Sequence, residues 1–356
     1  MTTRIILIFI VITTLGLTMS ELSLAQGTEP GEKDNLSTMS LRQMAEKKLH
    51  HNRTRFVNPF IRGRRGFFEI IKWKLFNANR FKKYYRDEKI TPVKIDWDPI
   101  KRHNSLSITF ITHATVMIKD SSTYILVDPV LNGIAWPIKD FTPLTFDPSE
   151  MPKPETILIT HGHYDHLDID SLDLFTEYSR YICPLGYRDI LEDIGAKRIQ
   201  ELDWYEGTSE GKAEIILLPC NHWTMRNPVT GPNTALWGSY IIKTSSGEVI
   251  YISGDTAYFD GFREIGDEFP IDLAIFNLGA YEPRWFMKQS HMNPQETVRA
   301  FLELGAKKLM IVHWGTFRLG DEPVHFPPVE IRKEMENRGI ADMLIDIRHG
   351  ETLYIK

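Results

Sequence analysis

Residues 160–168 read THGHYDHLD and concentrate side chains that bind divalent metals. His161, His163, Asp165 and His166 stand close together in this stretch. Imidazole nitrogens and carboxylate oxygens are ligands that zinc takes in hydrolytic sites. Three neighbouring histidines without a metal would be unfavourable, because the protonation of one opposes the protonation of the next. The cluster therefore predicts metal binding.

Four donors do not complete a site for two metals. A hydrolytic zinc usually takes three protein ligands and keeps one position for water, so two metals about 3.5–4 Å apart need about six or seven donors. Three further polar side chains stand where apolar runs end, namely His222 in PCNHW, Asp255 in SGDT and His313 in VHWGT. Asp255 is suited to bridge two metals, because its two oxygens bind separately. A lone histidine at a strand end is more often structural, so the prediction for His222 and His313 depends on the cluster.

The elements that position these donors are short apolar runs bounded by turn residues or charges, a pattern that predicts strands. His161 and His163 follow directly on one such run, and Gly162 between them permits a close approach of the backbone. The predicted strands are 107–111, 115–118, 124–127, 156–159, 214–218, 239–242, 249–253, 273–276, 309–312 and 353–355.

A helix is predicted over residues 294–304. Asn293 is a suitable N-cap, Pro294 fits the first helical position, and Glu296 completes a capping box with the cap residue. Gly305 predicts the end of this helix. Strands mixed with helices over about 250 residues indicate a layered α/β domain.

The N-terminus has the pattern of an export signal. Arg4 precedes an apolar run at 5–19, and small residues follow at 23–25, so a signal peptide is predicted over 1–25. The run is shorter than the ~20 residues that a spanning helix needs, and an uncleaved N-terminal anchor is the alternative. We therefore expect an exported protein, periplasmic or membrane-associated. Residues 26–52 are predicted to form a linker or N-terminal extension.

The composition is that of a globular chain, with 42% hydrophobic and 25% charged residues among 356. Its two cysteines, Cys183 and Cys220, would be able to pair in an oxidising compartment, although two cysteines alone do not establish a disulfide. Two thiols also do not supply a zinc-ribbon site. Any metal must therefore be held by histidine and aspartate.

Charge is unevenly distributed along the chain. Residues 40–89 contain 15 Lys or Arg and 4 acidic residues, a net +11, which leaves −16 for the rest of the net −5. Basic and aromatic side chains together suit an anionic lipid surface; the same pattern also fits a solvated helix that buries its aromatic rings against the main domain, and both can hold. Nucleic acid is not a predicted partner, because the remainder is acidic. The interleaved aromatic residues are Phe56, Phe60, Phe67, Phe68, Trp73, Phe76, Phe81, Tyr84 and Tyr85.

The order of the metal-binding motifs resembles that of the metallo-β-lactamase superfamily. These motifs are HGHYDHLD, the segment with His222, SGDT and VHWGT. Further motifs resemble the N-acylphosphatidylethanolamine-hydrolysing phospholipase D family within it, and GAYEPRWFMK is the most specific of them. The resemblance covers roughly residues 53–356. It implies a four-layer αβ/βα sandwich over 53–356, with the basic-aromatic segment 53–100 at its N-terminal side. The motifs are FVNPF (56–60), IQELDWYE (199–206), ALWGSY (235–240), LGAYEPRWFMK (278–288), HMNP (291–294), HWGTF (313–317) and RHGE (348–351).

The resemblance also implies two Zn²⁺ ions per chain and a role for each donor. One zinc is assigned His161, His163 and His222. The other is assigned Asp165, His166 and His313, with Asp255 bridging the two. One departure from the family is Thr112, which stands where a glycine usually precedes the histidine of ITHAT.

The same resemblance implies roles for further residues. His291 is expected beside the metals, and Asp128 is expected to support the ligands from behind. The channel for the lipid headgroup and acyl chains is expected to be lined by Tyr281, Arg284, Trp285 and Phe286.

The reaction expected from this site is hydrolysis of a phosphodiester. A metal pair lowers the pKa of bound water toward ~7, and Asp165, Asp255 and His291 are the predicted catalytic residues. The expected enzyme is a zinc-dependent phosphodiesterase of phospholipase D type, which converts N-acylphosphatidylethanolamine to N-acylethanolamine and phosphatidic acid at a membrane surface. The alternative is a hydrolase of the same fold that acts on a lactone or a soluble phosphodiester. A non-catalytic envelope protein is disfavoured by the full donor set, and the oligomeric state stays open.

Overall fold

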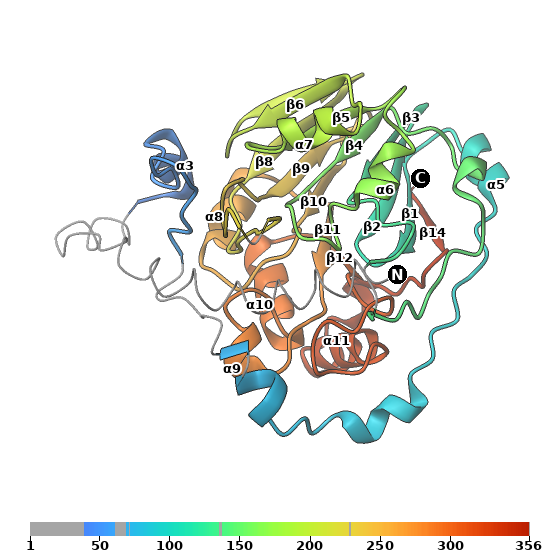
Figure 1. Cartoon of the computed structure of the whole chain (residues 1–356). Helices are drawn as coiled ribbons and strands as arrows, with labels where there is room; N and C mark the ends of the chain where they lie inside the picture. Colours follow the sequence, from blue (N-terminus) through green and yellow to red (C-terminus); the bar gives the residue numbers. More distant parts are fainter. Residues whose placement is uncertain (1–38, 61–68, 71, 135–136, 228, 356) are drawn as a thin grey trace, which may run out of the picture.

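The computed structural model describes residues 39–60, 69–70, 72–134, 137–227 and 229–355 (Figure 1). The predicted signal peptide over 1–25 lies outside the described residues. Within the described part of the chain, no helix combines the length and the apolar character needed to cross a membrane.

Two seven-stranded sheets form the centre of the molecule. The first has the order β14-β1-β2-β3-β4-β5-β6 and the second the order β13-β12-β11-β10-β9-β8-β7. The first sheet contains β1 (Ser107–Thr112), β2 (Thr115–Asp120), β3 (Thr123–Val127), β4 (Thr156–Leu158), β5 (Arg180–Pro184), β6 (Arg198–Leu202) and β14 (Thr352–Tyr354). The second contains β7 (Gly207–Glu210), β8 (Ala213–Leu218), β9 (Ser239–Lys243), β10 (Val249–Ile252), β11 (Leu273–Asn277), β12 (Lys308–Val312) and β13 (Leu344–Ile345).

Helices cover the outer faces of both sheets (Figure 1). Leu172 and Leu191, from the helices outside the first sheet, pack with Ile157 and Tyr181 of that sheet. The predicted αβ/βα four-layer sandwich is therefore confirmed. The helices are α3 (Leu41–Glu46), α5 (Trp97–Arg102), α6 (Ile169–Asp173), α7 (Arg188–Asp193), α8 (Gly261–Glu268), α9 (Arg284–Met287), α10 (Pro294–Leu304) and α11 (Phe326–Asn337), with short helical turns at Lys72–Phe76, Lys82–Asp87, Pro148–Glu150 and Ala341–Met343.

The predicted elements are found where the sequence places them. Each predicted strand corresponds to an observed one, and α10 begins and ends as expected. The Asn293 side chain accepts from the backbone of Glu296 at 2.9 Å, and Gly305 ends the helix with a left-handed φ of 66°. Cys183 and Cys220 are free and buried, so the possible disulfide does not form.

Parallel pairing brings the functional ends of the strands together. β3, β4, β5 and β6 run parallel in the first sheet, and β10, β11 and β12 run parallel in the second. The carboxyl ends of parallel strands meet at one edge of a sheet, which is where ligands bind in α/β proteins. The predicted metal donors all follow such strand ends or β8.

The N-terminal extension packs on the domain from α3 onward. Leu41 and Ala45 are buried in the main core. Asp203 lies 2.6 Å from Nε2 of His50, 2.8 Å from Nε2 of His51 and 2.6 Å from Nζ of Lys48. These are hydrogen-bond distances, and the Lys48 ammonium forms an ion pair with the carboxylate. Asp203 therefore ties the extension to the sandwich.

Residues 72–88, which belong to the basic-aromatic segment, pack against the loop 318–324. Trp73 is buried, and its indole N–H donates to Asp321 at 3.0 Å. The Asn77 amide also donates to the Asp321 side chain, and the Tyr85 hydroxyl donates to the backbone carbonyl of Asp321. The segment forms short helical turns and not one continuous helix, while Leu75 stays 73% exposed. Anchored and exposed side chains therefore coexist in it.

Glu322, which follows Asp321 in the same loop, has a buried side chain. Glu322 accepts from the backbone N–H groups of Tyr281 at 3.2 Å and Glu282 at 3.0 Å. Burial raises the pKa of Glu322 to about 8, from an ordinary 4.5, in spite of these two donors. The native protein therefore holds this carboxyl group protonated up to about pH 8.

This pKa predicts a pH-dependent effect of Glu322→Gln on stability. Because the unfolded chain ionises Glu322 at a lower pH than the native protein does, wild type loses stability as pH rises from 4.5 toward 8. The neutral glutamine lacks this loss, so the variant gains up to about 4 kcal/mol relative to wild type over that range. Urea unfolding at pH 5 and pH 8 measures the difference. The exposed Glu336→Gln is the control, and a pH-independent effect of Glu322→Gln contradicts the prediction.

Candidate metal centre

The first group of donors comprises His161, His163, His222 and Asp255, whose ligand atoms all lie within 4.8 Å of one another. Nδ1 of His163 is 2.9 Å from Nε2 of His161 and 3.3 Å from Nε2 of His222. The Asp255 carboxylate lies 3.7 Å from Nε2 of His161. The turn after β4 thus meets the ends of β8 and β10 at one point.

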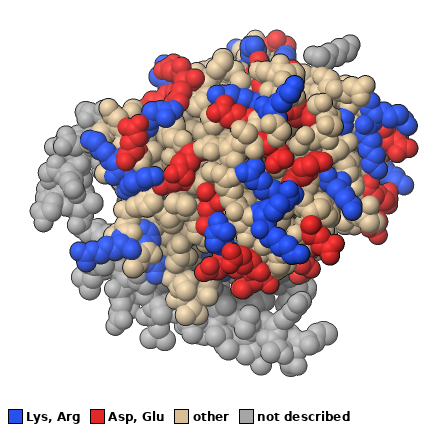
Figure 2. All heavy atoms as spheres, turned by 90° about the horizontal axis from the view of Figure 1, so that it is seen from above, with Lys and Arg blue, Asp and Glu red and all other residues tan. Residues whose placement is uncertain are grey.

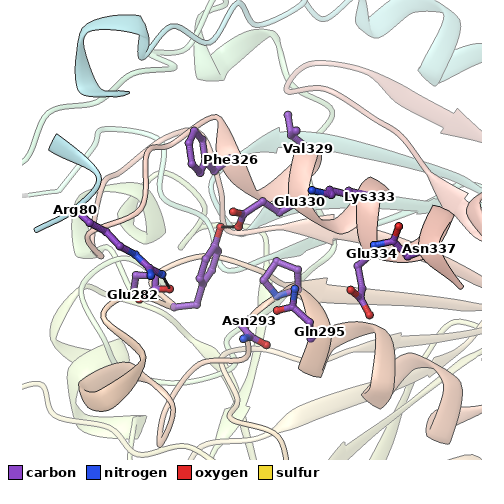
Figure 3. A pocket seen from close by; sticks show the side chains of 12 residues that line it. Arg80, Glu282, Asn293, Gln295, Phe326, Val329, Glu330, Lys333, Glu334 and Asn337 are labelled. Carbon is purple, nitrogen blue, oxygen red and sulfur yellow. Dashed lines mark hydrogen bonds and ion pairs between the residues drawn. The ribbon is translucent and has the colours of Figure 1, made fainter. Parts of the chain in front are cut away.

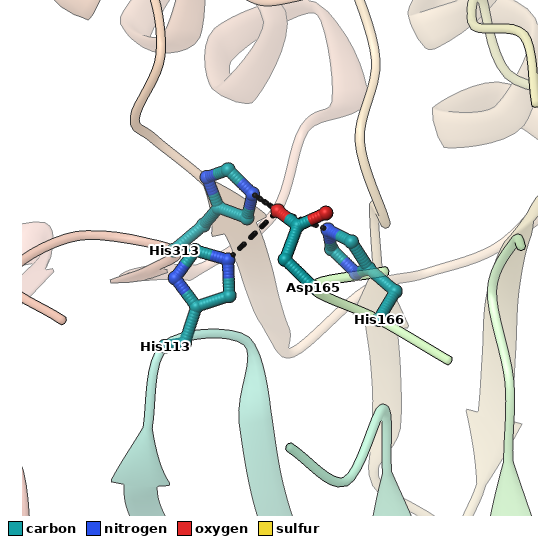
Figure 4. A group of neighbouring side chains, drawn as sticks. All are labelled: His113, Asp165, His166 and His313. Carbon is teal, nitrogen blue, oxygen red and sulfur yellow. Dashed lines mark hydrogen bonds and ion pairs between the residues drawn. The ribbon is translucent and has the colours of Figure 1, made fainter. Parts of the chain in front are cut away.

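The second group comprises Asp165, His166, His313 and His113 (Figure 4). Oδ2 of Asp165 is 3.3 Å from Nε2 of His313 and 3.6 Å from Nε2 of His166. His313 follows β12 directly and has a left-handed φ of 66°. Its backbone conformation turns the imidazole toward the end of β4.

Asp255 lies between the two groups. Its carboxylate is 3.3 Å from Nε2 of His166 and 3.3 Å from Nε2 of His313, besides its approach to His161. Two ligands of one zinc, with bonds of about 2.0–2.2 Å in tetrahedral geometry, are separated by about 3.3 Å. Nε2 of His166 is also a buried nitrogen without a hydrogen-bond partner. The residues therefore fit two metal ions with Asp255 between them.

Asp128 supports this arrangement from behind. Its carboxylate accepts from Nδ1 of His166 at 2.8 Å, and from the backbone and hydroxyl of Thr160 at 2.8 and 2.6 Å. A carboxylate on one imidazole nitrogen fixes the tautomer and frees the other nitrogen for a metal. Asp128 thus lies where the sequence comparison placed it, and the carbonyl of Ser290 plays the same part for Nδ1 of His222 at 3.0 Å.

The protonation states favour metal binding at neutral pH. Burial lowers the pKa of His161 and His222 well below the usual value, and lowers that of His163 to about 4. Burial opposes ionisation of Asp165 and Asp255, but the surrounding imidazoles hold the pKa of both well below the usual range. Most of the imidazoles are therefore neutral beside ionised carboxylates, the state that metals require.

His166 is the exception among these imidazoles. Burial lowers its pKa, but the Asp255 and Asp165 carboxylates outweigh burial and raise the pKa well above the usual value. Without a metal this imidazole carries a proton, which a metal would displace.

His291 lies beside the two groups, as predicted. Its Nδ1 is 3.9 Å from Asp255, and its ring centroid is 5.5 Å from that of His222. Burial lowers the pKa of His291 to about 4, so the imidazole is neutral at pH 7. Arg284 holds this loop, because its guanidinium donates to the His291 carbonyl at 2.9 Å and pairs with Glu296 at 2.6 Å.

Two of the predicted substrate contacts have internal partners. Arg284 is engaged in the contacts just described, and Tyr281 is buried with its hydroxyl donating to Glu330. The observed contacts of these two side chains are internal to the protein, and their substrate role stays a prediction. Trp285 donates to Asn77 at 3.2 Å, and the ring of Phe286 packs against Trp73. For these two the substrate role stays a prediction.

A pocket of about 600 Å³ lies between α10 and α11 (Figure 3), beside the hydrogen bond from Tyr281 to Glu330. None of the predicted metal donors lines it. It is lined by Arg80, Tyr281, Glu282, Asn293, Pro294, Gln295, Phe326, Val329, Glu330, Lys333, Glu334 and Asn337.

His113 was missed as a site residue from the sequence. It stands in the turn between β1 and β2, and its Nε2 is 3.1 Å from Oδ2 of Asp165. The available signal was a histidine at the end of a predicted strand, which alone is weak. Thr112, the departure from the family, bonds through its hydroxyl to Thr316 at 3.1 Å, and Thr316 accepts from the backbone of His113. The threonine thus helps to fix the turn.

The fold and these donors define a metal-dependent hydrolase of the metallo-β-lactamase class. The family described as "Beta-lactamase superfamily domain" matches residues 123–314, more than half of the chain. The chain belongs to this superfamily. A possible metal-dependent hydrolase from Veillonella parvula has a similar structure, with a TM-score of 0.59 and 17% identity, over 70% of this chain and 100% of that one.

Sequence relatives extend the comparison. N-acyl-phosphatidylethanolamine-hydrolyzing phospholipase D 1 of Caenorhabditis elegans is 29% identical over 312 residues, which cover 81% of this chain and 86% of that protein. An uncharacterized protein of Mycobacterium tuberculosis is 33% identical over 231 residues, 61% of this chain. The chain spans 61% of the length of this mycobacterial relative.

The support from Asp128 predicts a loss of metal affinity in Asp128→Asn. The amide is a weaker acceptor for the imidazole of His166, and loss of such a partner typically costs 10–100-fold in metal affinity. Competition with a chelator, followed by elemental analysis of the protein, measures the change. Asp189→Asn on the exposed face of α7 is the control. An Asp128→Asn protein that keeps wild-type metal affinity contradicts the assigned role.

Proposed function

We propose that this chain is a zinc-dependent phosphodiesterase of phospholipase D type, which hydrolyses N-acylphosphatidylethanolamine to N-acylethanolamine and phosphatidic acid. The observation that carries the proposal is the pair of histidine–aspartate groups joined by Asp255. The relative from Caenorhabditis elegans, similar over most of both chains, supports the choice of substrate. Two zinc ions per chain are part of the proposal.

His161, His163 and His222 would hold one ion, Asp165, His166 and His313 would hold the other, and Asp255 would contact both. A metal pair lowers the pKa of coordinated water and neutralises charge on a phosphodiester. Burial keeps His161, His163 and His222 neutral. Asp128 fixes the orientation of the His166 imidazole, and the Ser290 carbonyl fixes that of His222.

His291 contributes at the rim of this site. Its imidazole is neutral at pH 7 and is held by the hydrogen bond from Arg284 to its backbone. A positioned neutral imidazole can donate a hydrogen bond to the leaving oxygen and orient it. Arg284 thereby acts through the loop, and His291 is the group proposed to meet the substrate.

The segment 72–88 is the proposed contact with the membrane. Lys72, Lys82 and Lys83 are exposed there, together with Leu75. Lysine side chains attract anionic headgroups, and an exposed apolar side chain enters the interface. The face in Figure 2 carries acidic and basic side chains side by side, whereas nucleic-acid binding favours a uniformly basic one. Export of the protein, to the periplasm or to a membrane, is proposed from residues 1–25 alone.

The central prediction concerns Asp255→Asn. Loss of the shared carboxylate is expected to reduce kcat/KM on N-acylphosphatidylethanolamine vesicles by about 10³-fold or more, as for removal of a central catalytic group. Mass spectrometry of the products from zinc-loaded protein measures N-acylethanolamine directly. Asp189→Asn is the matched control. Turnover of soluble phosphodiesters or lactones without release of N-acylethanolamine would favour the alternative substrate class.

A second prediction tests the membrane contact. Leu75→Asp places a charge on the proposed interface and removes an apolar side chain worth about 1.5–3 kcal/mol on burial, so vesicle binding is expected to weaken about 10-fold or more. Co-sedimentation with anionic vesicles measures the binding. Val229→Asp is the control, because Val229 is 86% exposed and lies outside this segment. Equal loss in both variants rules out a specific role for Leu75.

A further inference from the structure

We propose that His113 is the positioning residue of Asp165, holding this carboxylate in the orientation that the second metal needs. The proposal deepens the proposed function, because it concerns the same site. Figure 4 shows the imidazole of His113 and that of His313 directed at one oxygen of Asp165. The distance from Nε2 of His113 to Oδ2 of Asp165 is 3.1 Å.

His113 approaches Asp165 and not the shared carboxylate. Among the described residues, the imidazoles within 4.0 Å of Asp255 are those of His161, His166, His222, His291 and His313. The imidazole of His113 instead reaches Asp165 from the turn between β1 and β2. It thus lies outside the set of side chains that surround Asp255.

Metal binding separates the role of His113 from that of its neighbours. In the described structure Oδ2 of Asp165 contacts three imidazoles, those of His113, His166 and His313. His166 and His313 would give their Nε2 lone pairs to the metal, so neither of these nitrogens would carry a hydrogen to donate to Asp165. Of these three, only His113 remains a hydrogen-bond donor to the carboxylate once the metal is bound.

The backbone holds His113 firmly for this purpose. Its N–H donates to the hydroxyl of Thr316 at 2.8 Å, and its carbonyl accepts from the N–H of His313 at 2.7 Å. Its ring packs on the rings of His313 and Phe317, with centroids 4.1 and 4.9 Å apart. The hydrogen bond from His313 therefore couples the position of His113 to a ligand of the same metal.

A fixed donor matters because the orientation of the Asp165 carboxylate depends on two side-chain torsions. The side chain is partly exposed, at 13%. A hydrogen bond to one oxygen selects one orientation before the metal arrives, and such supports typically contribute 10–100-fold to metal affinity. The imidazole N–H of His113 is the group placed to do this.

The test compares His113→Leu, which fills the space without a donor, with His113→Gln and His113→Asn, which keep a side-chain N–H. Titration with Zn²⁺ in the presence of a competing chelator measures two successive affinities without any substrate. We expect His113→Leu to weaken the second affinity 10–100-fold and to leave the first unchanged, with recovery in at least one amide variant. The proposal is overturned if the second Zn²⁺ affinity is weakened equally in all three variants, or if it is weakened in none of them.

A double-mutant cycle separates positioning from packing. In an Asp165→Asn background, the effect of His113→Leu on the second Zn²⁺ affinity should disappear, because its partner carboxylate is gone. An unchanged effect overturns the proposal. If His113→Leu does not fold, the cycle is run with His113→Gln and His113→Asn, with circular dichroism of the metal-free proteins as the folding check. Since no substrate is used, failure here is distinct from failure of the proposed reaction, which would leave these affinities as expected.

Discussion

The arrangement of the molecule depends on one buried carboxylate, Asp255, surrounded by imidazoles. Its side chain is 2% exposed, and it lies within 4 Å of histidines from four separate segments of the chain. A buried charge is unfavourable unless it is paired. The carboxylate therefore requires the ends of β4, β8, β10 and β12 to converge, and the two parallel halves of the sandwich supply that convergence. Around it, the hydrogen bond to Asp128 fixes which nitrogen of His166 faces inward, and the hydrogen bond to Ser290 does so for His222.

Much of this was predictable from the sequence, for identifiable reasons. The predicted strands are apolar runs that end in turns, and β8, β10 and β12 each lead into a metal donor, so one pattern revealed both strand and donor. The sequence did not predict β5 and β6, because RYICP and RIQEL mix charged and apolar residues without clear alternation. β7 is a polar edge strand, GTSE, which no hydrophobic pattern marks.

The contacts of individual side chains within the site were harder to predict, for a different reason. Tyr281 and Arg284 belong to a specific motif, but the direction of a side chain depends on partners far along the sequence. Glu330 takes the Tyr281 hydroxyl, and Glu296 takes the Arg284 guanidinium. His113 escaped because a single histidine in a hairpin turn carries little signal by itself. Its significance depends on Asp165, which only the fold brings within 3.1 Å.

The pairing of β14 with β1 bears on how fragments of this protein are designed. β14 closes the first sheet, and Gly350 and Phe110 share a backbone hydrogen bond next to it. A fragment cut to the region that matches the family, residues 123–314, would lose β1, β2 and β14 together and leave β3 as an open edge. Open strand edges promote aggregation. Such a fragment would also lack the hairpin turn that touches Asp165, so shortened versions for crystallisation or display need both flanks.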